Sequence, residues 1–142
     1  MNEINTSRRW ESIDFTVYFR FTWWIAIIAI VVEIALRILG DKLGAGILYE
    51  QKELVAWVVR AVSFAVIGWR AVKAFGGGVM IGAISGSIAG FMIGLIISLY
   101  KFADGFAVWK LFNIFTETVS CIIVGAVISM IAVSIISKIK NK

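Results

Sequence analysis

Five glycines recur at every fourth position inside one hydrophobic stretch, and they constrain the fold more than any other feature. They are Gly78, Gly82, Gly86, Gly90 and Gly94. On an α-helix this spacing places all five on one side, where another helix can approach to backbone contact. The stretch from Gly77 to Tyr100 contains no charged residue and is long enough to cross a bilayer. The sequence therefore predicts a membrane protein in which helices pack closely.

The composition agrees with a membrane environment. Hydrophobic residues make up 61% of the chain, charged residues make up 16%, and the mean hydropathy is +0.94. A soluble domain is closer to half apolar and a quarter charged. With 142 residues and no proline, we expect a single membrane domain, 1–142, whose spans are not forced to kink.

The residue inventory excludes several kinds of chemistry. The chain has no histidine and one cysteine, Cys121. Most zinc, haem and copper sites, an intramolecular disulfide and a histidine-dependent nucleophile are therefore excluded. Asp104, Lys110, Thr116 and Glu117 have no recognisable catalytic spacing. We expect no enzyme activity, no cofactor and no metal.

Four hydrophobic stretches are long enough to be transmembrane helices, since a span needs about 20 apolar residues. The predicted spans are 21–39, 54–72, 77–100 and 111–136. Aromatic residues near their ends fit an interfacial belt: Trp23, Trp24, Trp57, Trp69 and Tyr100. The predicted fold is all-α, a polytopic membrane protein with four transmembrane helices in a bundle.

Two further segments have amphipathic character. Residues 1–20 form a juxtamembrane segment, and 7–21 place Trp10, Ile13 and Val17 on one helical face. We expect a helix lying on the head groups there, although the alternating pattern also permits a strand. The aromatic residues in 102–115 predict an interfacial helix before the fourth span or the wet start of that span. Alternatively, these aromatic side chains pack against the third span.

Positive charge is distributed unequally between the two sides of the predicted bundle. One side, with both termini and the second loop, holds Arg8, Arg9, Arg20, Arg70, Lys73, Lys138, Lys140 and Lys142. The opposite side holds Lys42, Lys52, Lys101 and Lys110. Cytoplasmic flanks carry an excess of Lys and Arg, so we expect both termini in the cytoplasm. The net charge of +5 is expected to meet lipid head groups rather than nucleic acid.

Ionisable residues within the predicted spans lie at similar depth. These residues are Glu33, Arg37, Arg60 and Glu117. Glu33 precedes the end of its span, and Arg60 follows the start of its own, by a distance of about 9 Å. Glu117 reaches the same depth if the fourth span begins near Leu111. Because an isolated charge there costs several kcal/mol, we expect these residues to pair.

The pairing leaves two interpretations open. The four residues form an ion or proton site or a gate, or they form a neutral salt-bridge network that fixes helix register. Arg37 lies one turn from Glu33 on the same helix face, so the two side chains can pair. Alternatively, Arg37 extends toward the membrane surface, and Glu33 pairs with Arg60. Double replacement of Arg60 and Glu33 by leucine restores expression only in the structural interpretation.

The glycine ladder also has two candidate partners. The fourth span carries small residues at the same spacing, Cys121, Gly125 and Ser129. The ladder packs against this stripe within one subunit, or it meets its own copy in a second subunit, or it does both. We therefore expect a structural or accessory protein that forms a homo-oligomer or joins other membrane subunits. The alternative is a small oligomeric channel or transporter that uses the charged cluster.

Overall fold

The structure is a computed structural model that describes residues 15–42, 49–76, 78–103 and 108–140. Its elements are four α-helices, α1 (Phe15–Lys42), α2 (Tyr49–Phe75), α3 (Val79–Ala103) and α4 (Val108–Lys140). All four are long and apolar enough to cross a membrane. The predicted all-helical, multi-pass membrane bundle is confirmed.

The helices extend beyond most of the predicted spans. α1, α2 and α4 each continue for several residues past the apolar stretch at both ends, since no proline interrupts them. α3 instead begins two residues later than predicted. Gly76 and Gly78 adopt φ angles of 78° and 140°, in the region that favours glycine, and so end the preceding helix and delay the next. Gly78 therefore lies before α3, and the helical part of the ladder is Gly82–Gly94.

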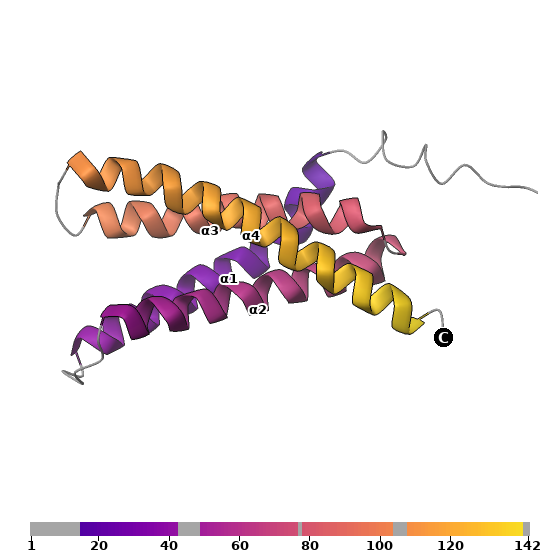
Figure 1. The fold of residues 1–142 in the computed structure, drawn as a ribbon, viewed down its shortest axis with the longest axis horizontal. Coiled ribbons are helices and arrows are strands. Elements are labelled where there is room, and N and C mark those ends of the chain that lie inside the picture. Colours follow the sequence, from indigo (N-terminus) through magenta and orange to yellow (C-terminus); the bar gives the residue numbers. More distant parts are fainter. Residues whose placement is uncertain (1–14, 43–48, 77, 104–107, 141–142) are drawn as a thin grey trace, which may run out of the picture.

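Two helical hairpins form the bundle, α1 with α2 and α3 with α4 (Figure 1). The first residues of α1 and the last residues of α4 lie at one end, here called the terminal end. The opposite end, where α1 and α3 finish and α2 and α4 begin, is the hairpin end. There the two hairpins diverge, whereas α4 crosses α2 toward the terminal end. Among the described residues, no Cα atom of α1 lies within 8 Å of a Cα atom of α4.

The glycine ladder packs against α4 of the same chain. A methyl group added at Gly86 would collide with the Gly125 carbonyl oxygen, and one at Gly90 with the Cys121 carbonyl oxygen. At Gly82 it would lie 2.9 Å from the Ser129 carbonyl oxygen. The ladder thus faces the predicted small-residue stripe within one chain, and its helical part is not a free surface for a second copy.

α2 approaches α4 through a second set of small residues. A methyl group at Gly68 would lie 2.6 Å from the Ser129 carbonyl oxygen. The Ser129 hydroxyl donates a hydrogen bond of 2.8 Å to the Phe64 carbonyl oxygen. Ser129 is fully buried, and its position between α2 and α3 explains why a small polar residue occupies it.

Apolar side chains dominate the interior between the middle of the bundle and the terminal end, where the hydroxyl side chains of Thr22, Ser85 and Ser129 are also buried. α1 contributes Ile25, Ala26 and Ala29, which pack with Phe64 and Ile67 of α2 and with residues of α3. A second cluster lies nearer the chain ends and contains Tyr18, Ala71, Val72, Ile81, Ile88 and Val133. This packing fills the bundle with side chains that bury apolar surface and offer few polar groups.

The two predicted interfacial segments have different outcomes. Residues 1–14 lie outside the described part of the chain, and from Phe15 onward the segment belongs to α1. Residues from Val108 onward belong to α4, so the aromatic segment is the start of the fourth span rather than a separate helix. Trp109, Phe112 and Phe115 are 64%, 70% and 67% exposed and so do not pack against α3. No helix-breaking residue lies between Val108 and Phe115, which explains the continuous helix.

Candidate functional site

Arg60 of α2 is the most deeply buried charge in the described part of the bundle and is fully enclosed. Its Nε donates to Oε2 of Glu33 at 2.8 Å, and its Nη2 donates to Oε1 of Glu33 at 2.7 Å. The same Nη2 donates to Oε1 of Glu117 at 2.8 Å, and Nη1 donates to Sγ of Cys121 at 3.2 Å. The guanidinium also lies 4.9 Å from the centre of the Trp57 ring. One side chain therefore links α2 to both α1 and α4.

The ion pairs around Arg60 continue into a closed ring. Arg37 pairs with Glu33 and with Glu53, both at 2.9 Å. Lys101 pairs with Glu53 and with Glu117, both at 3.0 Å. Cations and carboxylates alternate, and each group contacts two groups of opposite charge. We call this arrangement the charge ring, formed in order by Arg37, Glu33, Arg60, Glu117, Lys101 and Glu53.

All four helices contribute to the charge ring, and α1 and α2 each contribute two residues from one helix face. Glu33 and Arg37 are one turn apart on α1, and Glu53 and Arg60 are two turns apart on α2. α3 contributes Lys101 from its last turn, and α4 contributes Glu117. The ring has three positive and three negative groups, so it is neutral as a whole.

Burial decreases from one side of the ring to the other. The side chains of Glu33 and Arg60 are each 1% exposed, whereas those of Glu53 and Lys101 are 20% and 26% exposed. The inner part therefore lies in a low-dielectric interior, where breaking an ion pair is costly. The outer part faces a cavity at the hairpin end.

The structure brings together the four charged residues singled out in the sequence and adds two that were missed. Glu53 and Lys101 lie at the edges of the predicted spans, where a charge is ordinarily interpreted as a surface residue. The seven-residue spacing between Glu53 and Arg60 is the signal that places both on one face of α2. Lys101 carries no comparable signal, because the rest of its helix is uncharged.

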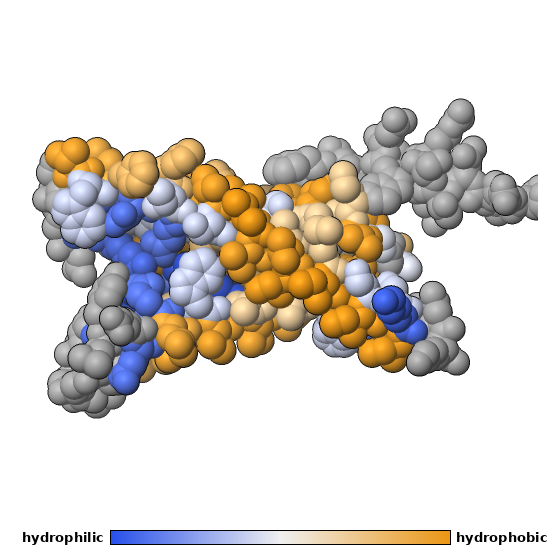
Figure 2. All heavy atoms as spheres, in the orientation of Figure 1, coloured by the Kyte–Doolittle hydropathy of each residue, from blue (hydrophilic) through white to orange (hydrophobic). Residues whose placement is uncertain are grey.

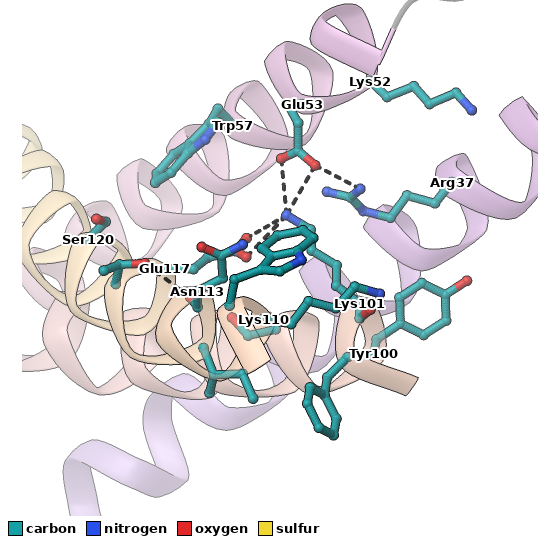
Figure 3. A pocket seen from close by; sticks show the side chains of 15 residues that line it. Arg37, Lys52, Glu53, Trp57, Tyr100, Lys101, Lys110, Asn113, Glu117 and Ser120 are labelled. Atoms are coloured by element: carbon teal, nitrogen blue, oxygen red, sulfur yellow. Dashed lines mark hydrogen bonds and ion pairs between the residues drawn. The ribbon is translucent and has the colours of Figure 1, made fainter. Parts of the chain in front are cut away.

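A cavity of about 890 Å³ opens at the hairpin end, outside the charge ring, and we call it the vestibule. Side chains from all four helices line it, including Arg37, Lys101, Glu53 and Glu117 of the ring. Lys101 extends between the two carboxylates (Figure 3). Hydrophilic residues gather between the diverging hairpins, with hydrophobic surface on either side (Figure 2).

Cys121 connects the charge ring to the glycine ladder. Its thiol is fully buried, accepts a hydrogen bond from Arg60, and lies on the α4 turn that contacts Gly90 and Gly94. The described residues contain no group of three His, Cys, Asp or Glu side chains that could hold a metal ion. The site is therefore one of paired charges within a tightly packed helical frame.

No protein-family model matches the chain, and no curated protein or solved structure matches it. Function must consequently be argued from the site itself.

Proposed function

We propose that the protein is a structural or accessory membrane subunit, a non-conducting bundle that assembles with its own copies or with other membrane chains. The observation that carries this proposal is the closed charge ring. Each of its three carboxylates contacts two cations, and each cation contacts two carboxylates. Such a ring holds four helices in register without providing an unpaired group for transport.

The energetics of the ring support a static role. A carboxylate that exchanges protons or ions must leave its partners during each cycle. Removing one partner from a buried pair typically destabilises a protein by about 3–5 kcal/mol. For Glu33, which contacts both Arg37 and Arg60 at 1% exposure, this penalty disfavours an exchange role.

The apolar interior beyond the ring supports the same conclusion. From Arg60 toward the terminal end, the interior is filled by Phe64, Ile67, Ile93 and the residues packed with them. The buried hydroxyl of Ser129 is engaged by the Phe64 carbonyl oxygen. A polar solute passing through one subunit would therefore meet a packed hydrophobic core.

Assembly would use the outward faces of the bundle, since the ladder is covered by α4. α1 packs mainly against α2 and α3 among the described helices and exposes Ile28 and Val31. α4 exposes Ile123 and Ile131 in the same way. These faces fit either lipid or a second transmembrane helix.

Gentle extraction from native membranes followed by native mass measurement tests the proposal. Cysteine substitutions at Ile28 and Ile123 allow cross-linking in the membrane before extraction. The native Cys121 is fully buried and serves as the control that should not react. Cross-linked dimers or a stoichiometric foreign subunit are expected. A monomer with no cross-link at either position would contradict an assembly role.

The vestibule favours a second candidate, a carrier whose cavity is open at the hairpin end. In that case, loading of the vestibule must be coupled to breakage of ion pairs in the ring. Purified protein in liposomes would then give solute or proton flux that Glu117→Gln changes. The assembly proposal expects no flux from the wild-type protein in the same liposomes, so this experiment separates the two candidates.

A further inference from the structure

We propose that Arg70, held against two aromatic rings at the terminal end, binds the phosphate group of an anionic membrane lipid. The site lies where α1 begins and α2 ends, at the end of the bundle opposite to the vestibule (Figure 1). This inference concerns a lipid ligand and does not depend on whether the bundle assembles with other chains.

The first observation is that the Arg70 guanidinium has aromatic neighbours but no acidic partner. Its Cζ lies 4.5 Å from the centre of the Trp24 ring and 5.2 Å from the centre of the Phe21 ring, both on α1. In the described part of the chain, the Arg70 side chain makes no ion pair. An aromatic face attracts a cation but does not neutralise its charge. The rings therefore position the guanidinium without supplying a counter-charge.

The second observation is the contrast with the arginines of the charge ring. Arg37 and Arg60 each pair with two carboxylates. The acidic residues of the described helices all lie in the half of their helix nearer the hairpin end: Glu33, Asp41, Glu50, Glu53 and Glu117. The terminal half of the described helices thus provides no carboxylate for Arg70. Its N–H donors are available for an acceptor from the membrane.

The third observation is depth in the membrane. Arg70 is half-buried and lies in the last turns of α2, which ends at Phe75. Trp69 precedes it, and Trp23 lies beside its ring partner on α1; both tryptophans are exposed. Tryptophan concentrates where the hydrocarbon meets the head groups. A guanidinium at this level is within reach of lipid phosphate groups.

Neighbouring cations favour an anionic lipid over a zwitterionic one. Lys73 follows Arg70 by one turn, and its Nζ lies 4.1 Å from the centre of the Trp69 ring. Arg20 precedes Phe21 on α1 and is exposed. Neither residue makes an ion pair in the described helices. Basic residues grouped at a membrane surface attract anionic head groups, and the charge distribution predicts that this end faces the cytoplasmic leaflet.

The surroundings of Arg70 identify a lipid as the source of the phosphate. The planar guanidinium can bind two phosphate oxygens at once, and its contact with the rings reduces the freedom that it loses on binding. Next to it, Val58, Val62 and Trp69 share one exposed, apolar face of α2 that runs toward the middle of the bundle. A lipid can place its phosphate at Arg70 and its chains along this face, whereas a free phosphate gains only the first contact.

Lipid retention measured by native mass spectrometry tests the proposal. The full chain is purified from membranes that contain phosphatidylglycerol and phosphatidylcholine, and the retained lipid is identified. Arg70→Gln removes the guanidinium, whereas Trp24→Leu removes its nearer ring and leaves every charge in place. The matched control Lys138→Gln removes one exposed cation from the same end of the bundle, on α4. The buried Cys121 thiol, unreactive in folded protein, reports that each variant is folded.

We expect the wild-type protein and the control to retain phosphatidylglycerol in preference to phosphatidylcholine. Arg70→Gln should bind phosphatidylglycerol about fivefold more weakly, since a basic residue near a membrane surface contributes roughly this factor to the affinity for anionic lipid. Trp24→Leu should weaken binding about two- to fivefold, the range for one cation–π contact. Soluble glycerophosphate should not displace the lipid at equal concentration.

Four results would overturn the proposal. They are equal retention of both lipids by the wild-type protein, wild-type affinity in Arg70→Gln or in Trp24→Leu, a loss in Lys138→Gln as large as that in Arg70→Gln, and displacement by glycerophosphate. The third result would show a diffuse attraction of the whole basic end, and the fourth would show a site for free phosphate.

Discussion

Arg60 and Glu33 are joined by two parallel hydrogen bonds, from Nε to Oε2 at 2.8 Å and from Nη2 to Oε1 at 2.7 Å. This two-point contact fixes rotation as well as distance, which a single ammonium group cannot do. Because the residues belong to α2 and α1, the pair sets how these helices face each other. The remaining donors of Arg60 then position α4 through Glu117 and Cys121.

Replacement of Arg60 by leucine should destabilise the bundle by about 3–5 kcal/mol, because Glu33 and Glu117 each lose a cation in the interior. The double variant Arg60→Leu/Glu33→Leu should recover most of this loss. Its remaining groups, Arg37, Glu53, Lys101 and Glu117, still alternate in sign and remain neutral. The unfolding temperatures of the variants are compared in detergent, with the reactivity of the buried Cys121 thiol as the probe of unfolding. A double variant as unstable as the single one would show that the ring does more than neutralise charge.

A methyl group in the glycine ladder should loosen the contact between α3 and α4. Gly86→Ala places a methyl group against the Gly125 backbone, which cannot move aside, and should cost at least about 1–3 kcal/mol. The matched control is Gly40→Ala, whose nearest neighbour is the flexible end of Lys52 at 3.3 Å. The control should unfold at the wild-type temperature or slightly above it. Equal stability of both variants would contradict the packing described here.

The hydrogen bond between α4 and α2 should have a smaller effect. Ser129→Ala removes the donor to the Phe64 carbonyl oxygen and should cost roughly 0.6 kcal/mol, the average for such bonds between membrane helices. Ser134→Ala is the control, because that hydroxyl bonds only within its own helix, to the Met130 carbonyl oxygen. The same unfolding assay should rank Gly86→Ala as more damaging than Ser129→Ala, and a reversed order would argue against backbone contact as the main source of specificity.

The charge distribution predicts that the terminal end faces the cytoplasm. Cysteine placed at Gln51 should therefore react with a membrane-impermeant thiol reagent in intact cells, and cysteine placed at Lys138 should react only after the cells are opened. Both positions are exposed in the bundle, whereas the native Cys121 is buried. If only the cysteine at Lys138 were labelled in intact cells, the terminal end would face the outside, which would contradict the prediction.

Sequence reasoning predicted the four helices because their apolar length is a property of each segment alone. It also anticipated that Glu33 and Arg60 lie at one depth, since depth follows from position along a span. It could not choose the partner of the glycine ladder, because Gly82–Gly94 offers the same groove to α4 and to a second copy. Glu53 and Lys101 were missed because they lie at the edges of the predicted spans, where a charge is ordinarily interpreted as a surface residue, and only the packed structure shows that both pair inside the ring.

The composition of the charge ring also bears on how the chain enters a membrane. α1 and α2 together carry Glu33, Arg37, Glu53 and Arg60, and the ion pairs among these four residues require no residue of a later helix. α3 and α4 carry Lys101 and Glu117, which pair with each other. Within each hairpin the residues of the charge ring thus balance one another. The chain can partition into the bilayer as two consecutive hairpins whose ring charges are already paired, with the cross-pairs forming only when the two hairpins meet side by side.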